Sequence, residues 1–289
     1  MREADLRGLG ISIGGRNVVE LRYADDTCLI GINITQMRKV IGKVNRSGKK
    51  AGLELNEKKT KVMHIKWKNS QAEEFTIIEV NGVVLEKVEH FKYLGSIKSS
   101  DGTCLKDVKT RIAMAKQKMV QLNNLWKDRS VPNSLKITIL KCLVWPVVMY
   151  GCEAWTLRRE EEKKLEAAEM YFYRQLLRVT WKDKRTNESI LEELSTERIL
   201  LQEIKRRKLR YLGHANRNTR TDLMTSIFQG RVEARRNRGR PATSYMDNIT
   251  SSTGLRIDEV VHRSTDRDDW RAVVAMNGAA TDVHGDADR

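Results

Sequence analysis

Residues 18–31 read VVELRYADDTCLIG, an alternation of apolar and polar residues that predicts two short strands joined by a tight turn. The turn holds two adjacent carboxylates, Asp25 and Asp26. Like charges at a hairpin tip repel and tight turns favour Asn-Gly or Asp-Gly, so the pair is difficult to explain as a stabiliser of the fold. A bound cation would offset the repulsion, and Mg²⁺ prefers such oxygen ligands. A solvated turn without any ligand is the alternative, because adjacent aspartates are common.

An amphipathic helix is expected after this hairpin. Its apolar residues recur at helical spacing from Thr35, a suitable N-cap, until Gly48 and Gly52 end the run. Residues 53–56 and 62–67 then predict strands on either side of a basic turn. This order of elements is typical of a βαβ-like edge of a larger sheet.

Two further hairpin signals follow. Asn81-Gly82 lies between two β-branched runs, and this dipeptide suits the positive φ angles of a type I′ turn. A third apolar run covers residues 91–95 and ends near another turn signal, Asp101-Gly102. We expect β structure to stop there.

The chain after residue 103 is predicted to be mainly helical. Apolar residues spaced by three and four over residues 105–126 predict a long helix whose stripe faces a core. Pro146 must kink or end the next helix, because proline lacks the N–H group and clashes with the preceding turn. Further helices are expected over residues 160–179 and 197–212. We therefore place a domain boundary where the helices begin.

Net charge is the outlier of the composition. The chain has 54 Lys and Arg against 38 Asp and Glu, a formal net charge of +16 and a pI of about 9.7. This balance indicates a polyanionic partner, with nucleic acid as the first candidate and an anionic membrane surface as the second. No apolar run approaches the ~20 residues of a membrane-spanning helix, and no secretion signal is expected. We therefore expect an intracellular protein whose four scattered cysteines are reduced thiols rather than zinc ligands.

Positive charge concentrates between Lys205 and Arg240, where twelve Lys or Arg accompany only two acidic residues. Such side chains could neutralise several phosphates of a nucleic acid, and Tyr211 and His214 could stack on bases. A nuclear import signal, or merely a solvated helix, is the alternative. The candidates for nucleic-acid binding are Lys205, Arg206, Arg207, Lys208, Arg210, Arg238 and Arg240.

Three motifs follow one another in the first hundred residues: YADD at residues 23–26, GLELNEKKTK at 52–61 and FKYLG at 91–95. In this order they resemble the metal-binding motif, the following palm motif and the primer-grip hairpin of reverse transcriptases. Residues 145–155 and 266–271 extend the resemblance, which is to enzymes of the non-LTR (LINE-like) retrotransposon kind. The resemblance implies Mg²⁺-dependent, RNA-templated DNA synthesis.

The same resemblance implies roles for individual residues. Asp25 would hold the metal, Asp26 would be its less essential neighbour, and Tyr23 would contact the primer end. Lys59 would donate a proton to pyrophosphate, although a basic turn beside a metal site equally suits phosphate screening. The implied partners are an RNA template, a DNA primer and dNTPs, and Mg²⁺ is the implied cofactor. Contacts with primer or template are expected from Tyr23, Phe91, Tyr93, Leu94 and Gly95.

One departure from the family pattern concerns the catalytic carboxylates. Such enzymes bring a further aspartate from an earlier palm strand, whereas the only aspartate before Asp25 is Asp5, which lies in no comparable strand. Two metal ions cannot be held without that carboxylate. We therefore expect the C-terminal part of such an enzyme, inactive alone. A non-catalytic RNA- or DNA-binding remnant of the element is the alternative.

The expected fold is α+β, with a partial right-hand polymerase palm of β-hairpins plus a helix, followed by an all-helical thumb-like domain. The palm part would cover residues 1–102 and the thumb-like domain residues 103–195. A basic helical region is expected over residues 196–275 and a disordered tail over 276–289. A nuclear location would accompany a nucleic-acid partner.

Overall fold

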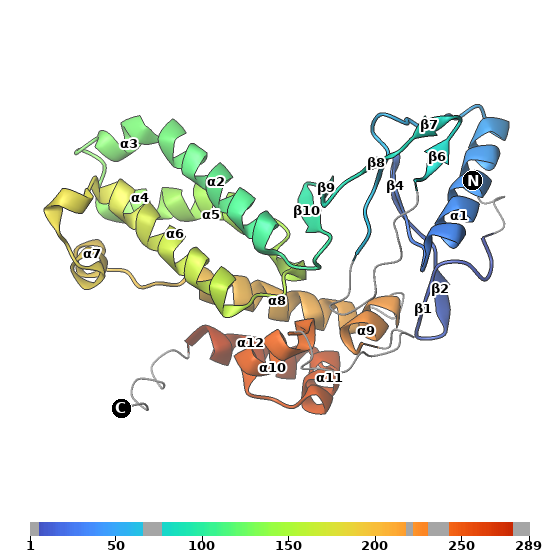
Figure 1. Ribbon diagram of the computed structural model, residues 1–289. Helices are drawn as coiled ribbons and strands as arrows, with labels where there is room; N and C mark the ends of the chain where they lie inside the picture. Colours follow the sequence, from blue (N-terminus) through green and yellow to red (C-terminus); the bar gives the residue numbers. More distant parts are fainter. Residues whose placement is uncertain (1–5, 66–76, 218–221, 231–242, 280–289) are drawn as a thin grey trace, which may run out of the picture. The chain divides into compact units, whose positions relative to one another are not determined.

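The structure is a computed structural model that describes residues 6–65, 77–217, 222–230 and 243–279. The chain divides into two compact units (Figure 1). Unit 1 comprises Met1–Thr103 and Thr219–Arg240, and unit 2 comprises Cys104–Asn218 and Pro241–Arg289. Helices and small sheets occur together, which agrees with the expected α+β class.

The strands in the described part of unit 1 pair two by two. They are β1 (Ile11–Ile13), β2 (Arg16–Val18), β3 (Glu20–Tyr23), β4 (Asp26–Leu29), β5 (Lys61–Val62), β6 (Glu79–Val80), β7 (Val83–Val84), β8 (Glu86–Lys87), β9 (His90–Tyr93) and β10 (Ser96–Ser99). β1 with β2, β3 with β4, β6 with β7 and β9 with β10 are antiparallel, whereas β5 with β8 is parallel. A short helix, α9 (Asp222–Phe228), lies beside β1. Two-stranded pieces are marginal alone, so they depend on packing against a helix.

One face of α1 (Ile34–Lys50) supplies that packing. Val40 and Val44 are buried together with Val19, the residue that precedes β3. Ile41 is buried against Ile78 and the β6–β7 hairpin. These positions recur at helical spacing, as the sequence predicts, and the helix thereby holds both hairpins.

Local signals at element ends give one confirmed prediction and one error. Asn81 and Gly82 have φ angles of 52° and 81° and join β6 to β7, so the predicted tight hairpin is confirmed. The predicted N-cap Thr35 is wrong. The cap is Asn33, whose side-chain oxygen accepts a hydrogen bond from the Gln36 N–H at 2.8 Å.

The strands expected around the basic turn are mostly absent. Residues 53–56 form no strand, and of the run predicted at 62–67 only Val62 is in a strand among the described residues. Asn56 instead holds a local turn, in which its side chain accepts a hydrogen bond from the Lys59 N–H at 3.1 Å. Backbone groups that bond locally are not available to a sheet ladder.

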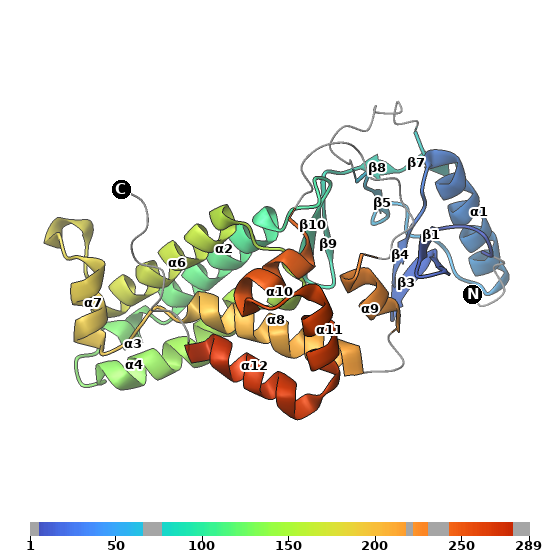
Figure 2. The same ribbon diagram turned by 90° about the horizontal axis from the view of Figure 1, so that it is seen from below.

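Unit 2 is helical throughout its described residues. Its elements are α2 (Leu105–Gln121), α3 (Asn123–Lys127), α4 (Asn133–Ile139), η1 (Leu140–Val144), α5 (Trp145–Val148), η2 (Cys152–Ala154), α6 (Arg159–Leu177), η3 (Trp181–Asp183), α7 (Asn187–Leu194), α8 (Leu200–Arg217), α10 (Tyr245–Thr253), α11 (Ile257–Thr265) and α12 (Arg267–Ala279). Helix α8 packs against α6 on one side and against α10, α11 and α12 on the other (Figures 1 and 2). Unit 2 is thus organised around α8.

The predicted helix over residues 105–126 is divided at Leu122 into α2 and α3, and its apolar stripe faces the core as predicted. Pro146 lies in the first turn of α5, directly after the π-helical turn η1. A missing N–H group costs least in a first helical turn. The chain then turns at Gly151, where φ is +71°.

The expected disordered tail is wrong in part. Helix α12 continues to Ala279, so order extends past the predicted start at residue 276, and residues 280–289 lie outside the described part. None of the described helices combines the length and the apolar character that crossing a bilayer requires.

Candidate functional site

The aspartate pair lies at the tip of the β3–β4 hairpin in unit 1. Tyr23 and Asp26 face each other as the last pair of the ladder, so Ala24 and Asp25 form a two-residue turn. Ala24 has a φ of +52°, a region in which tight turns usually place glycine. All four side chains are exposed, Tyr23 by 66%. The tip therefore presents two carboxylates and a phenol ring to solvent.

The β9–β10 hairpin packs against this one. The Tyr93 hydroxyl donates a hydrogen bond to the Leu21 carbonyl oxygen at 3.3 Å. The pKa of Tyr93 is raised, first by burial and then by the nearby Cys28 and Asp26. Side chains alternate along a strand, so Leu21, Tyr23, Asp26 and Cys28 share one face of the hairpin. Two of the three sequence motifs are thus brought together.

The remaining residues of the third motif, FKYLG, form the β9–β10 hairpin itself. Leu94 and Gly95 form the turn, with φ angles of 48° and 81°, and Leu94 is 41% exposed at the tip. Phe91 is half-buried in β9. An exposed apolar tip therefore belongs to the hairpin that packs against the aspartate hairpin, and the primer-grip role implied by the resemblance stays a prediction.

Lys59 belongs to a different local structure. It lies exposed in the turn held by Asn56, and the neighbouring Glu57 accepts a hydrogen bond from Asn81 Nδ2 at 2.9 Å. This segment is therefore tied to the β6–β7 hairpin. In the described part of the chain no hydrogen bond or ion pair joins Lys59 to Asp25, so the proton-donor role rests on the sequence resemblance alone.

The aspartate pair fits a Mg²⁺ ion only in part. Two adjacent exposed carboxylates suit an ion that keeps several waters and shares its remaining sites with substrate phosphates. Among the described residues, however, no group of three or more His, Cys, Asp or Glu side chains is placed to hold a metal. These residues therefore do not complete a two-metal centre.

The cations predicted to bind nucleic acid lie on α8 in unit 2, apart from Arg238 and Arg240, which are outside the described residues. Three of them pair with acidic side chains: Lys205 with Glu162 at 3.1 Å, Arg206 with Glu203 at 3.6 Å, and Arg207 with Glu203 at 3.7 Å. Arg210 is exposed and has no ion-pair partner in the described part. His214 is exposed and Tyr211 half-buried.

Lys208 is the exception and corrects the sequence prediction. Its side chain is buried, its Nζ donates a hydrogen bond to Asn248 Oδ1 at 2.9 Å, and it lies 4.8 Å from the ring centroid of Tyr245. Burial lowers the pKa of Lys208 to about 8. A buried amine with these partners is not available for a phosphate contact.

Helix α8 is fixed at its start by a buried carboxylate. Glu169 Oε1 accepts hydrogen bonds from the N–H groups of Ile199 and Leu200, at 2.9 and 3.0 Å, and from the Tyr173 hydroxyl at 2.9 Å. Burial raises the pKa of Glu169, against the lowering effect of these donors. A carboxylate at a helix N-terminus accepts hydrogen bonds from N–H groups that have no partner within the helix. Its negative charge also interacts favourably with the helix dipole.

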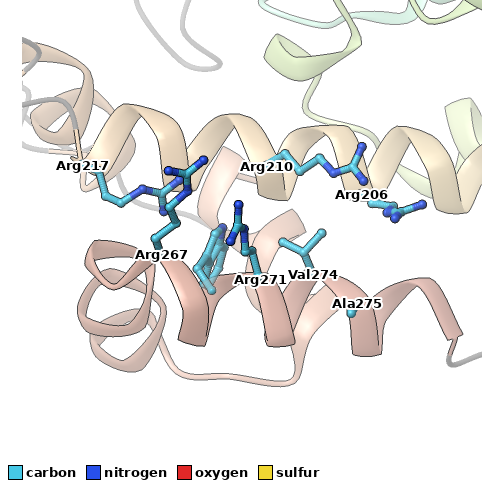
Figure 3. A pocket seen from close by; sticks show the side chains of 8 residues that line it. Arg206, Arg210, Arg217, Arg267, Arg271, Val274 and Ala275 are labelled. Carbon is cyan, nitrogen blue, oxygen red and sulfur yellow. The ribbon is translucent and has the colours of Figure 1, made fainter.

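A cavity of about 370 Å³ between α8 and α12 joins two predicted residues, Arg206 and Arg210, to residues that the sequence did not single out (Figure 3). Five arginines line it, namely Arg206, Arg210 and Arg217 from α8 and Arg267 and Arg271 from α12. The i, i+4 spacing of Arg267 and Arg271 was a possible signal, but the approach of two helices about 50 residues apart was not visible. The basic surface of α8 is thus extended by α12.

Comparison with known proteins agrees with the motifs in the β-hairpin unit. Residues 7–97 match the family described as "Reverse transcriptase (RNA-dependent DNA polymerase)". The chain is also 24% identical over 275 residues to a Caenorhabditis elegans protein described as transposon-derived, covering 92% of this chain and 98% of that protein. No solved structure matches the chain. These similarities support a reverse transcriptase-related protein.

Proposed function

We propose that this protein derives from the reverse transcriptase of a non-LTR (LINE-like) retrotransposon and carries the C-terminal part of its polymerase. In this proposal the β-hairpins of residues 1–102 belong to the palm, and the helices that follow form a thumb-like region and a basic region. The parent reaction is Mg²⁺-dependent, RNA-templated DNA synthesis, and the protein acts in the nucleus. Template RNA, primer DNA and dNTPs are its partners.

The observation that carries the proposal is the pairing of two hairpins. The aspartate tip of β3–β4 lies within the residues that match the reverse transcriptase family, and Tyr93 of the predicted primer grip packs on the face that carries Asp26. In the proposed role Asp25 and Asp26 hold one partly hydrated Mg²⁺, which would supply charge to the substrate phosphates. The chain alone does not polymerise in this proposal, because the described residues lack a third carboxylate for a second ion.

A second candidate is a nucleic-acid-binding protein without catalysis. It is favoured by the incomplete carboxylate set and by the arginine-rich surface of unit 2. Both candidates require binding of nucleic acid, and they differ only at the aspartate hairpin.

Paramagnetic Mn²⁺ in place of Mg²⁺ tests the hairpin in the full chain bound to a primer–template. We expect NMR signals of residues 21–28 to broaden selectively, and Asp25→Asn to abolish that broadening. Loss of a direct ligand should cost at least the ~10–100-fold in metal affinity that loss of an indirect partner costs. Asp258→Asn, an exposed aspartate in α11, removes the same charge and should leave the broadening intact.

Primer extension on a poly(A) template tests the proposed inactivity, because neither candidate predicts synthesis by the chain alone. Synthesis that disappears in Asp25→Asn and persists in Asp258→Asn would show that the chain is an active enzyme, contrary to the proposed inactivity alone. Selective broadening without synthesis is the result we expect. Broadening that is equal at the hairpin and at unrelated acidic residues would contradict a metal role for Asp25 and favour the binding protein.

A further inference from the structure

The cavity between α8 and α12 concentrates positive charge from two helices. Arg206, Arg210 and Arg217 reach it from α8, and Arg267 and Arg271 from α12 (Figure 3). No acidic side chain is among its lining residues. Arginines that line one cavity repel one another, and an anion bound among them would offset that repulsion.

Internal partners leave most of this charge uncompensated. Arg206 and Arg271 have single acidic partners, Glu203 at 3.6 Å and Asp268 at 3.1 Å. Arg217 donates a hydrogen bond to a neutral acceptor, the carbonyl oxygen of Ser264 in α11, at 2.9 Å.

The other two arginines are the least compensated. Arg210 and Arg267 are exposed and have no ion pair in the described part of the chain. The Nε of Arg206 is also buried, and none of the residues that the structure describes gives it a hydrogen-bond partner. Donors left in this state are suited to an anionic ligand.

The two helices that carry the arginines are held together firmly. Trp270, which lines the cavity, is 2% exposed, and its Nε1 donates a hydrogen bond to the Leu209 carbonyl oxygen at 2.8 Å. Gly213 allows this contact, because a Cβ built there would lie 2.2 Å from Trp270 Cδ1. Asn216 Nδ2 donates to Ser264 Oγ at 2.7 Å and ties α8 to α11 as well. The spacing of the arginines is therefore set by packed helices rather than by a loose surface.

We propose that this cavity, the α8–α12 arginine pocket, binds consecutive phosphates of a nucleic-acid backbone. Guanidinium groups bind phosphate oxygens in a two-pronged geometry and stay charged at any physiological pH. Arg206 and Arg217 are eleven residues apart, which is about 16 Å along a helix with a 1.5 Å rise per residue. One strand of B-DNA carries a phosphate every ~3.4 Å of axis, so a row of this length suits several phosphates rather than a single anion.

The binding is independent of base sequence. The lining offers guanidinium groups and apolar surface, and Trp270 is buried with its N–H group already bonded, so it cannot stack on a base. The inference deepens the nucleic-acid partner of the proposed function and does not depend on the aspartate hairpin.

Fluorescence anisotropy with a labelled RNA–DNA duplex of arbitrary sequence tests the pocket in the full chain. The pocket variant is Arg210→Gln with Arg267→Gln, and the matched control is Arg129→Gln with Arg159→Gln, two exposed arginines elsewhere in unit 2. We expect the pocket variant to weaken binding at least about tenfold near 0.1 M salt and to lower the slope of log K against log salt by about 1.8, since each lost phosphate contact removes ~0.9. The control should lose much less.

A conservative variant separates geometry from charge. Arg210→Lys with Arg267→Lys keeps both charges but loses the two-pronged donors, and we expect it to retain the salt slope with an intermediate affinity. Circular dichroism and thermal unfolding check that all variants fold. Equal losses in the pocket and control variants, or no loss in either, would overturn the pocket.

Free pyrophosphate distinguishes the source of the phosphate. If it raises the Tm of the wild type but not of the pocket variant, while duplex binding is equal in all variants, the pocket takes a free anion and the nucleic-acid assignment is overturned. The anisotropy assay compares substitutions in unit 2 alone, whereas the Mn²⁺ assay reads residues 21–28 of unit 1. Failure of the pocket would thus leave the Mn²⁺ result at the hairpin intact, and failure at the hairpin would leave the pocket intact.

Discussion

Lys208 stands among exposed cations of α8, yet it behaves as a core residue. Desolvation by burial is the main cause that lowers its pKa to about 8, and the nearby Cys104 and Cys152 only partly oppose it. The sequence run KRRKLR gives no sign of this difference. The position of each side chain around the helix, and not the charge of the run, decides which of them faces α10.

Replacing this buried amine should change how stability depends on pH. Between pH 8 and 10.5 the unfolded chain holds a proton on Lys208 that the folded chain has lost, so this residue makes stability rise with pH across that window. In Lys208→Met that rise is absent. We expect the free energy of unfolding of Lys208→Met, relative to that of the wild type, to fall by about 2 kcal/mol between pH 7 and about pH 9.5, measured by urea unfolding under reducing conditions.

The thiols near Lys208 are present in both proteins, so their titration largely cancels in the comparison. Lys208→Arg is a useful control, because arginine does not lose its proton in this range and should be the less stable variant throughout. A difference between the wild type and Lys208→Met that stays constant with pH would show that Lys208 is not buried as a charged amine.

At the scale of elements, the contact between α8 and α12 depends on one glycine. In Gly213→Ala the new Cβ would meet the Trp270 indole, which cannot move without breaking its hydrogen bond to Leu209. Overpacking of this kind typically costs about 1–3 kcal/mol, more than the helix propensity that alanine gains. We expect the variant to have a lower unfolding midpoint.

Gly42→Ala is the matched control for this substitution. Gly42 lies in the middle of α1, and a Cβ there would meet nothing within 4 Å. Alanine should therefore stabilise α1 by up to about 1 kcal/mol, the difference in helix propensity. Opposite shifts of the two midpoints are the prediction, and a stabilising Gly213→Ala would disprove the close approach of α8 and α12.

What the sequence could predict at this scale depends on how local each cause is. The turn at Asn81-Gly82 follows from two residues, and the helix over residues 105–121 follows from one periodic stripe, so both are predicted well. The prediction of a strand over residues 62–67 was mostly wrong. Its observed part, β5, pairs in parallel with β8, which lies 25 residues further along the chain. A cue for α10 was present but missed, since Ser244 and Asp247 form a capping box.

The candidate sites divide in the same way. The hairpin of Asp25 was predictable because its strands and turn are contiguous in sequence. The arginine pocket was not, because it needs α8 and α12 to approach each other and a glycine to meet a tryptophan. The charge of the sequence indicated the arginines of α8 but not those of α12.

At the scale of the whole molecule, the described residues build their apolar clusters within unit 1 and within unit 2 separately. Val40 belongs to a cluster between α1 and the β-hairpins, and Val148 to the large cluster of the helical unit. Both side chains are fully buried. Separate cores predict separate cooperative units of opening.

Two equal truncations test this in the full chain. Val40→Ala and Val148→Ala each remove the same two methyl groups from a packed core, at a cost of roughly 1–3 kcal/mol. In native-state hydrogen exchange we expect Val40→Ala to speed exchange of amides in α1 while leaving α2 and α6 protected, and Val148→Ala to do the reverse. Because the two substitutions are chemically identical, a difference in which amides exchange faster is due to the location of the valine, in the core of unit 1 or in that of unit 2. If either variant instead lowered protection equally in α1, α2 and α6, the two units would open as one, and the salt-dependent binding of unit 2 could not be separated from the integrity of the aspartate hairpin.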